Sequence, residues 1–241
     1  LRRLEYRGYD SAGVVYSQGQ KLVRHRAKGK LSQLEAVLDD YIGVDSSAGL
    51  GHTRWATHGA PTELNAHPHS DCTGELVVVH NGIIENYSAL KNSLIERGHI
   101  FQSETDTEVL AHLIEEHLQD DLVLAVRTAL AQVEGSYALA VLWAKEPEML
   151  VAARNQSPLV LGLDAEACYL ASDIPALLPY TREVIFLDDG DLAVLQKGAY
   201  TILRLEDGCT IERESTTIEW TAAMAEKSGS RHYMIKEIFE Q

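Results

Sequence analysis

Residues 76–84 read Leu-Val-Val-Val-His-Asn-Gly-Ile-Ile, an apolar run of strand-forming residues that turns polar near its end. Asn-Gly after an apolar strand favours a tight hairpin turn. Only two apolar residues follow, however, before Glu85 opens a helical pattern, so no second strand of matching length is available. We therefore predict that Asn81 and Gly82 form the polar end of a strand and point into a site.

Similar runs of branched residues recur on both sides of this segment, and short turns separate them. The runs cover residues 11–16, 22–26, 76–79, 137–143, 150–153, 159–163, 168–171, 184–187 and 191–195. Because consecutive strands joined by tight turns cannot be parallel, we expect antiparallel sheets.

Three segments between the strands have the apolar spacing of helices that bury one face. The spaced residues are Leu31, Leu34, Leu38 and Tyr41, then Tyr87, Leu90 and Leu94, then Val109, Leu113 and Leu118. Gly98, preceded by Arg97, can take the left-handed conformation that ends the second helix. Thr105 and Glu108 match a capping box at the start of the third. Helices over antiparallel sheets place the chain in the α+β class.

The composition favours a folded domain and argues against two classes of partner. A chain of 241 residues with 45% hydrophobic residues can bury a substantial core. Its formal net charge of -15 repels nucleic acid and anionic membranes, and no apolar run approaches membrane-spanning length. Three cysteines without paired spacing are typical of a reducing cytoplasm. We expect one domain over residues 1–220, and a linker over 221–241 that leads to a further domain.

Three more polar segments have both functional and purely structural explanations. Residues 51–59, Gly-His-Thr-Arg-Trp-Ala-Thr-His-Gly, fit a capped strand end, residues 7–13 a turn, and residues 103–108 a capped helix. The histidines that cluster in the sequence are His52, His58, His67, His69 and His80. They include no helical His-x-x-x-His pair and no co-ligands at metal-site spacing, so we expect no metal and no cofactor.

Five motifs in order resemble those of the class II glutamine amidotransferases. They are Arg-Gly-Tyr-Asp-Ser at 7–11, His-Thr-Arg-Trp-Ala-Thr-His-Gly at 52–59, Asn-Ala-His-Pro-His at 65–69, His-Asn-Gly-Ile-Ile-Glu-Asn at 80–86 and Ser-Glu-Thr-Asp-Thr-Glu at 103–108. Residues 7–11, 104–108 and 231–238 look most like the glucosamine-6-phosphate synthases within that class. The resemblance runs from Leu1 to Gln241 and implies an N-terminal-nucleophile (Ntn) hydrolase fold, an αββα sandwich of two antiparallel sheets covered by helices.

The resemblance implies a binding site for L-glutamine. Arg54 would hold the substrate carboxylate with its planar fork, and Asp106 would pair with the ammonium group. Thr57 and His58 carry over as substrate contacts. Trp55 would form a wall of the pocket and gate the exit of ammonia.

Four further residues carry over as parts of the catalytic apparatus. The side-chain amide of Asn81 and the backbone N–H of Gly82 would stabilise the oxyanion that forms when the glutamine amide is attacked. Arg7 and Gly8 would orient the terminal amine of the polypeptide instead of touching glutamine.

The family pattern opens with a cysteine, followed by Gly-Ile-Val-Gly, whose own α-amine acts as the base for its thiol. Leu1 stands first here, and no free α-amine accompanies Cys72, Cys168 or Cys209. The 241-residue chain is therefore predicted to be inactive as a glutaminase. We also expect that an upstream segment with a core strand precedes it in the natural protein.

For the parent protein, the resemblance implies release of glutamate and ammonia from glutamine. Ammonia would pass to fructose 6-phosphate on a C-terminal isomerase domain, in an enzyme that is a homo-oligomer. Two alternatives are the glutaminase domain of another class II amidotransferase and a non-catalytic module that only binds glutamine. The residues 231–238 argue against the first, and Leu1 alone favours the second.

Overall fold

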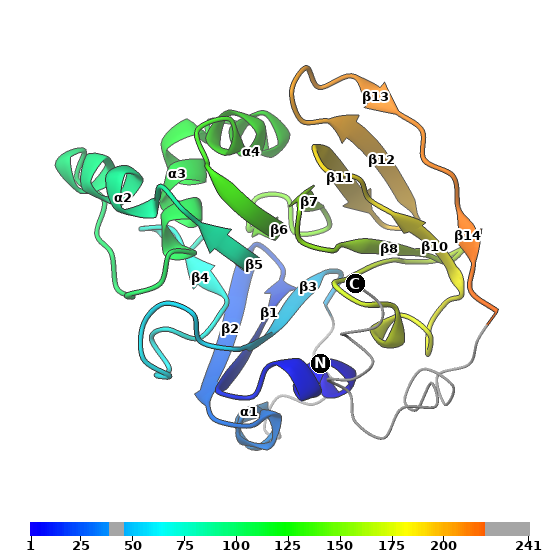
Figure 1. Cartoon of the computed structure of the whole chain (residues 1–241), viewed down its shortest axis with the longest axis horizontal. Coiled ribbons are helices and arrows are strands. Elements are labelled where there is room, and N and C mark those ends of the chain that lie inside the picture. Colours follow the sequence, from blue (N-terminus) through cyan, green and yellow to red (C-terminus); the bar gives the residue numbers. More distant parts are fainter. Residues whose placement is uncertain (39–45, 220–241) are drawn as a thin grey trace.

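The structure is a computed structural model that describes residues 1–38 and 46–219, with its elements labelled in Figure 1. The helices are η1 (Arg2–Arg7), α1 (Leu31–Leu38), α2 (Tyr87–Glu96), α3 (Glu108–His117), α4 (Leu122–Leu130) and η3 (Ile174–Ala176), η marking a 3₁₀-helix. The strands are β1 (Ser11–Gln18), β2 (Lys21–Lys28), β3 (Gly49–Arg54), β4 (His69–Ser70), β5 (Leu76–Ile84), β6 (Gly135–Trp143), β7 (Leu150–Asn155), β8 (Val160–Leu163), β9 (Cys168–Ala171), β10 (Glu183–Phe186), β11 (Asp191–Gln196), β12 (Ala199–Arg204), β13 (Thr210–Ile211) and β14 (Thr216–Thr217). None of the helices in these two ranges has the length and apolarity needed to span a lipid bilayer.

The largest sheet has seven strands in the order β13-β12-β11-β7-β6-β5-β4, and its neighbouring strands are all antiparallel. Both faces of this sheet are buried, and its strands contribute side chains to both, since alternate residues of a strand point to opposite sides. In β5, Leu76 and Val78 enter one apolar core while Val77 enters the other. The long apolar runs of β5 and β6 therefore belong to the centre of the molecule.

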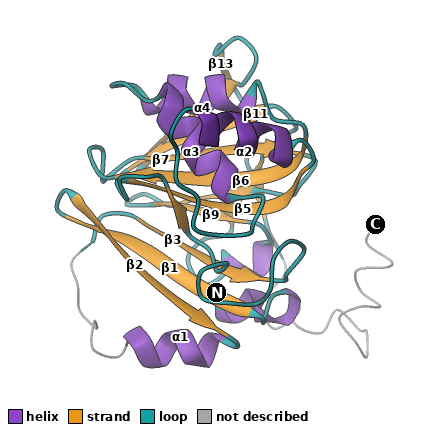
Figure 2. Ribbon diagram, turned by 90° about the vertical axis from the view of Figure 1, so that its left-hand side faces the viewer, coloured by secondary structure: helices purple, strands orange, loops and turns teal. Residues whose placement is uncertain are grey.

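Figure 2 shows the layers that cover this sheet. Helices α2, α3 and α4 lie over one face, where Leu110, Leu113 and Ile114 of α3 are fully buried. The other face packs on a three-stranded sheet, β2-β1-β3, and on a four-stranded sheet, β14-β10-β8-β9. Helix α1 packs on the outer side of the three-stranded sheet through Leu31 and Leu34. The expected α+β fold of antiparallel sheets between helical layers is confirmed.

The prediction that Asn81 and Gly82 end their strand is wrong. Strand β5 continues to Ile84 and pairs with β6 along its whole length, from Leu76 opposite Trp143 to Ile84 opposite Gly135. The partner strand lies some fifty residues further along the chain, so the local pattern contained no sign of it. The two residues are consequently held inside a strand, opposite Ala138 and Tyr137 of β6.

The predicted end of α2 is confirmed, whereas the predicted start of α3 is wrong. Gly98 has φ +98°, and its N–H donates to the Ile95 carbonyl at 3.0 Å. The capping box between Thr105 and Glu108 does not form, because α3 begins after Thr107, which makes no side-chain cap. The Glu108 carboxylate instead accepts the backbone N–H groups of residues 102 and 103, at 2.8 and 2.6 Å.

Several elements have no counterpart among the sequence predictions. Helix α4 was missed because Leu122–Leu130 is apolar almost throughout, which hides its period, although Asp121 caps it by accepting the Leu124 N–H at 2.9 Å. Strands β12 and β13 and the short β4 and β14 were also missed. The predictions for Tyr41 and for the linker 221–241 lie outside the described residues.

Candidate active site

A cavity of about 790 Å³ opens where β3, β5 and the start of α3 meet. It lies in the range of volumes typical of small-molecule sites. Its walls include every residue predicted for the site except Gly8, namely Arg7, Arg54, Trp55, Thr57, His58, Asn81, Gly82 and Asp106. Residues that are far apart in the sequence thus line one cavity.

Arg54 is the last residue of β3, and it is only 4% exposed. One guanidinium nitrogen, Nη2, donates to the backbone carbonyls of His58 and Gly59. The other, Nη1, is buried without a hydrogen-bond partner in the described structure, and its distance of 3.6 Å to Asp10 Oδ1 is too long for one. Burial lowers the pKa of Arg54, although Asp10 and Asp106 act in the opposite direction. A cation with one free donor therefore faces the cavity.

Asp10 is a site residue that the sequence predictions missed. Its Oδ2 accepts the backbone N–H of Ala56, and its own N–H donates to the Arg54 carbonyl at 3.2 Å. Asp10 thereby fixes the start of the loop that follows β3, on either side of Trp55. The only signal in the sequence was its place in the Arg-Gly-Tyr-Asp-Ser motif, where no role was assigned to it.

Asp106 stands just before α3 and is 4% exposed. Its Oδ2 accepts the backbone N–H of Ile84, the last residue of β5, at 2.9 Å. The residues on either side of Asp106 also form side-chain hydrogen bonds, each with a histidine. Thr107 Oγ1 lies 2.9 Å from His80 Nδ1, and Thr105 Oγ1 lies 3.1 Å from His69 Nε2. A buried carboxylate is therefore fixed at the wall of the same cavity as Arg54.

The side chain of Asn81 is oriented by His52 on the neighbouring sheet. His52 Nε2 lies 2.9 Å from Asn81 Oδ1. Burial lowers the pKa of His52 to about 4, so the ring is neutral at physiological pH and Nε2 carries the proton that it donates to Asn81. With its oxygen engaged, the amide of Asn81 keeps its two N–H donors for other partners.

The pairing of β5 with β6 requires glycine at position 82. It has φ +131°, a conformation that favours glycine, and a Cβ atom there would collide with the Ser136 carbonyl of β6. Gly8 has a similar restriction, since a Cβ would meet the Thr53 carbonyl of β3. Gly8 thus brings the chain of η1 close against β3, and it does not line the cavity.

The remaining predicted residues lie nearer the rim. Trp55 is 60% exposed and meets Tyr9 edge-on, with ring centroids 5.3 Å apart, so it leaves the cavity open. Arg7 donates to Ser172, the residue after β9. His58 meets Tyr87 edge-on at 5.3 Å, and its Nδ1 has no hydrogen-bond partner in the described structure.

Residues 38–205 match the glutamine amidotransferase domain family. The chain belongs to this family. Glutamine--fructose-6-phosphate aminotransferase [isomerizing] from Thermococcus kodakarensis is 51% identical over 243 residues, which cover 100% of this chain and 40% of the relative. The enzyme of the same name from a strain of Thermus thermophilus is 53% identical over 241 residues, covering 100% of this chain and 39% of the relative. The chain thus spans about two fifths of the length of these relatives.

Solved structures agree with the family assignment. Glutamine phosphoribosylpyrophosphate amidotransferase from B. subtilis superposes with a TM-score of 0.72 and 26% identity, over 86% of this chain and 46% of that one. A glutamine aminotransferase class-II domain protein from Silicibacter pomeroyi has a TM-score of 0.58 and 17% identity, over 80% of this chain and 90% of that one, which shows the fold alone.

The cysteines of this amidotransferase domain do not supply an activated thiol beside Asn81 and Gly82. Cys168 lines the cavity, but it lies on β9 and its thiol donates to the Ala199 carbonyl at 3.5 Å. Burial raises the pKa of Cys168, which keeps the thiol protonated at neutral pH. Cys72 and Cys209 are not among the residues that line the cavity.

Proposed function

We propose that this domain hydrolyses L-glutamine to glutamate and ammonia, once a cysteine nucleophile is supplied beside Asn81. The observation that carries the proposal is the pairing of a buried guanidinium and a buried carboxylate in one cavity with the oriented amide of Asn81. Free glutamine is a zwitterion with an amide tail, and each of its three polar groups has a matching partner there.

Arg54 and Asp106 recognise the amino-acid end of the substrate in this proposal. The free Nη1 donor of Arg54 binds the carboxylate, and the anchored carboxylate of Asp106 binds the ammonium group. Both groups are buried, so binding a simple amide would leave the Nη1 donor of Arg54 without a hydrogen-bond partner and the Asp106 carboxylate without an ammonium group. The site would therefore select amino acids over simple amides. Thr57 and His58 add contacts from the loop beside Arg54.

Asn81 and Gly82 act on the reacting amide. A thiolate adds to the amide carbonyl, and the electron pair of the C=O bond moves to oxygen, where the Asn81 N–H and the Gly82 N–H stabilise the negative charge. The C–N bond then breaks, nitrogen takes up a proton and ammonia leaves, so that a thioester remains. Water hydrolyses the thioester to glutamate and returns the thiol.

The shape of the cavity supports delivery of that thiol on an additional strand. Strand β3 lies at an edge of its sheet in the described part of the chain, and apolar residues of β3, β6 and the start of β8 line the space beside it, including Leu50, Ala140 and Leu159. A strand led by the family's cysteine would pair with this edge. Arg7 and Gly8 would then help to orient its terminal amine.

The names of the relatives support fructose 6-phosphate as the acceptor of the ammonia in a longer protein. Identity of 51–53% to these relatives contrasts with 26% to the phosphoribosylpyrophosphate amidotransferase. Because the chain covers about two fifths of these relatives, the acceptor site belongs to an isomerase domain outside it. Such an enzyme would be a homo-oligomer. The three free cysteines of this chain fit a reducing cytoplasm.

The test compares three purified proteins: the 241-residue chain, the chain extended by a strand that begins with cysteine, and the extended chain with that cysteine changed to alanine. We expect ammonia release from glutamine only from the second. Release above background from the 241-residue chain would overturn the assignment of the nucleophile. An extended chain that folds, binds glutamine and releases no ammonia would leave the module that only binds glutamine as the better account.

A further inference from the structure

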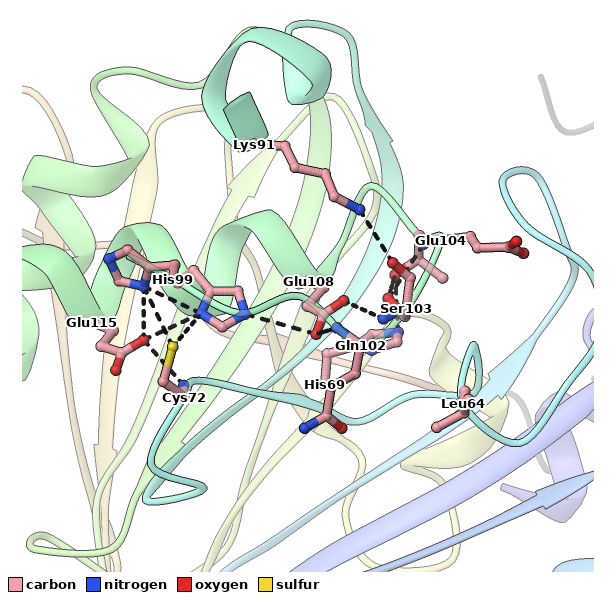
Figure 3. Close-up of polar contacts among 12 residues, drawn as sticks. Leu64, His69, Cys72, Lys91, His99, Gln102, Ser103, Glu104, Glu108 and Glu115 are labelled. Carbon is pink, nitrogen blue, oxygen red and sulfur yellow. Dashed lines mark hydrogen bonds and ion pairs between the residues drawn. The ribbon is translucent and has the colours of Figure 1, made fainter. Parts of the chain in front are cut away.

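A second group of polar side chains converges away from the residues that line the cavity, around α3 (Figure 3). Cys72 follows β4, His99 follows α2, and His112 and Glu115 lie one turn apart on α3. One donor atom of each residue lies within 4.8 Å of every other. Among residues 1–38 and 46–219, this is the group whose side chains could together hold a metal ion.

Five of the six distances between these donor atoms are close to the edges of a tetrahedron of zinc ligands, and every pair lies within 4.8 Å. With Zn–N of about 2.05 Å and Zn–S of about 2.3 Å, such edges are about 3.3 Å between two nitrogens and about 3.6 Å between sulfur and nitrogen. The two Nδ1 atoms of His99 and His112 are 3.3 Å apart. Cys72 Sγ lies 3.7 and 3.4 Å from them. Glu115 Oε2 lies 3.1 and 3.2 Å from the same nitrogens.

Both histidines also have the outer partners that metal-bound histidines need. His99 turns Nε2 toward Glu116 Oε2 at 2.9 Å, and His112 turns Nε2 toward Glu108 Oε1 at 3.7 Å. The Glu116 carboxylate fixes the proton of His99 on Nε2 by a hydrogen bond, whereas Glu108, beyond hydrogen-bond distance, favours a proton on Nε2 of His112 through its charge. In both cases Nδ1 is left to bind a metal. His112 Nε2 is buried without a hydrogen bond in the described structure, so a proton held there would face Glu108.

We propose that Cys72, His99, His112 and Glu115 form a structural zinc site. A mixed set of one sulfur, two nitrogens and one carboxylate oxygen in tetrahedral arrangement suits Zn²⁺. Four protein ligands leave no open position for a substrate, which makes the role structural. Cys72 is at the surface and His112 is fully buried, so the ion can enter from the side of Cys72.

The competing explanation is a cluster of hydrogen bonds and ion pairs in which Glu115 accepts from both histidines. That arrangement accounts for Glu115. It also accounts for the position of Cys72, whose backbone N–H donates to Glu115 Oε2 at 3.1 Å. It does, however, direct two imidazole nitrogens toward one oxygen while these nitrogens lie only 3.3 Å apart. A cation at the centre satisfies all four atoms at once.

The ion would join three segments that are far apart in the chain: the connection after β4, the loop between α2 and α3, and α3 itself. Glu108 extends this link, because the carboxylate behind His112 also accepts the backbone N–H groups of Gln102 and Ser103 (Figure 3). These residues lead directly to Asp106. Zinc would thus steady the loop that carries one wall of the cavity, whether or not the glutaminase proposal is correct.

The site escapes sequence analysis because only His112 and Glu115 are close in the sequence, three positions apart. Cys72 and Glu115 are 43 positions apart, and His99 lies 13 positions before His112. Only the pairing of β4 with β5 and the packing of α2 on α3 bring them together.

The first measurement is metal binding by the whole chain after removal of metal with a chelator. We expect one Zn²⁺ per chain, and Co²⁺ in its place should give the absorption of a tetrahedral site with a thiolate-to-cobalt band. At free zinc about 100 times the dissociation constant, the unfolding temperature should rise by roughly 5–10 °C. Absence of zinc uptake, or a cobalt spectrum without the thiolate band, would overturn the proposal.

The second measurement uses variants. Cys72→Ser should weaken zinc binding more than about 100-fold. Glu116→Gln leaves all four proposed ligands in place but weakens the partner of His99 and the ion pair of Glu116 with Arg97, and it should weaken zinc binding by about 10-fold. Cys209→Ser is the matched control, since Cys209 is exposed and lies outside the group. Equal zinc affinity in Cys72→Ser and Cys209→Ser would refute the assignment. If Cys72→Ser does not fold, Glu116→Gln and the cobalt spectrum of the unchanged chain still decide the question.

Discussion

Replacing Asp106 by asparagine removes one charge from the cavity wall and keeps the size of the side chain. If Asp106 pairs with the substrate ammonium, the change leaves that cation facing a neutral amide in a site where the residue is 4% exposed. Loss of one partner of a buried charge pair costs about 2–5 kcal/mol. The dissociation constant for glutamine should then rise by roughly 30-fold to several thousandfold.

The effect on the fold should be much smaller. Asparagine can still accept the Ile84 N–H that Asp106 accepts at 2.9 Å. What is lost is the interaction of a negative charge with the start of α3, worth at most about 1 kcal/mol, and the attraction between Asp106 and Arg54, which keeps Asp10 as an acidic neighbour at 3.6 Å. The two roles of Asp106 therefore predict opposite patterns: weak binding with normal stability for a substrate contact, and normal binding with lowered stability for a helix-end charge.

The assay is calorimetric titration of glutamine into the extended chain whose leading cysteine is alanine, so that substrate is bound and not consumed. Thermal unfolding is measured on the same samples. Glu104→Gln is the matched control, because it removes an exposed acid two residues earlier that does not line the cavity. A dissociation constant within threefold of the parent for Asp106→Asn, with a lowered unfolding temperature, would refute the ammonium role.

Three further predictions concern the same cavity. In the active extended chain, Asn81→Ala should lower kcat by roughly 100- to 1000-fold with little change in KM, because the oxyanion exists only in the transition state. Arg54→Lys should mainly raise KM. An unchanged kcat in Asn81→Ala would show that Asn81 takes no part in the chemistry. Gly82→Ala should lower the free energy of unfolding by about 1–3 kcal/mol in denaturant titrations, since the φ of +131° at Gly82 and the neighbouring backbone of β6 exclude a Cβ atom. A variant as stable as the parent would contradict the requirement for glycine at this position. The pKa of His52 is about 4 in the folded chain, below its ordinary value of 6.5, so the stability present above pH 6.5 should fall as the pH drops toward 4. The unfolding temperatures at pH 7.5 and pH 5 should therefore differ less in His52→Gln than in the parent. An equal difference in both proteins would show that His52 does not cause the pH dependence.

Much of the secondary structure could be predicted because it depends on neighbours in the chain. Strand β9 covers the residues predicted for it, 168–171, and Gly98 ends α2 as its conformational freedom suggests. The start of α3 shows the limit of such patterns. Thr105 and Glu108 have the spacing of a capping box, yet His69 engages Thr105 and the loop before α3 engages Glu108. Partners from elsewhere in the fold outcompete the local ones.

The site was predicted from motifs, and its geometry was not. Sequence motifs predicted Arg54, Asn81 and Asp106 as site residues, and they indicated the family to which the chain belongs. They could not assign the contacts of Asp10 with Arg54 and Ala56, which depend on the pairing of β1 with β3. They also could not show that His52 orients Asn81, because that contact joins two sheets.

The sequence by itself therefore determined the strands and helices with clear periodicity, the α+β class and the residue types of the candidate site, since each follows from local spacing or from an ordered motif. Only the tertiary structure decided that β5 runs through Asn81 and Gly82, that a buried guanidinium and a buried carboxylate line one cavity, and that Cys72 meets two histidines and Glu115. The physical reason is that pairing across a sheet and packing between layers join residues tens of positions apart, and the burial that results sets their partners and their charge.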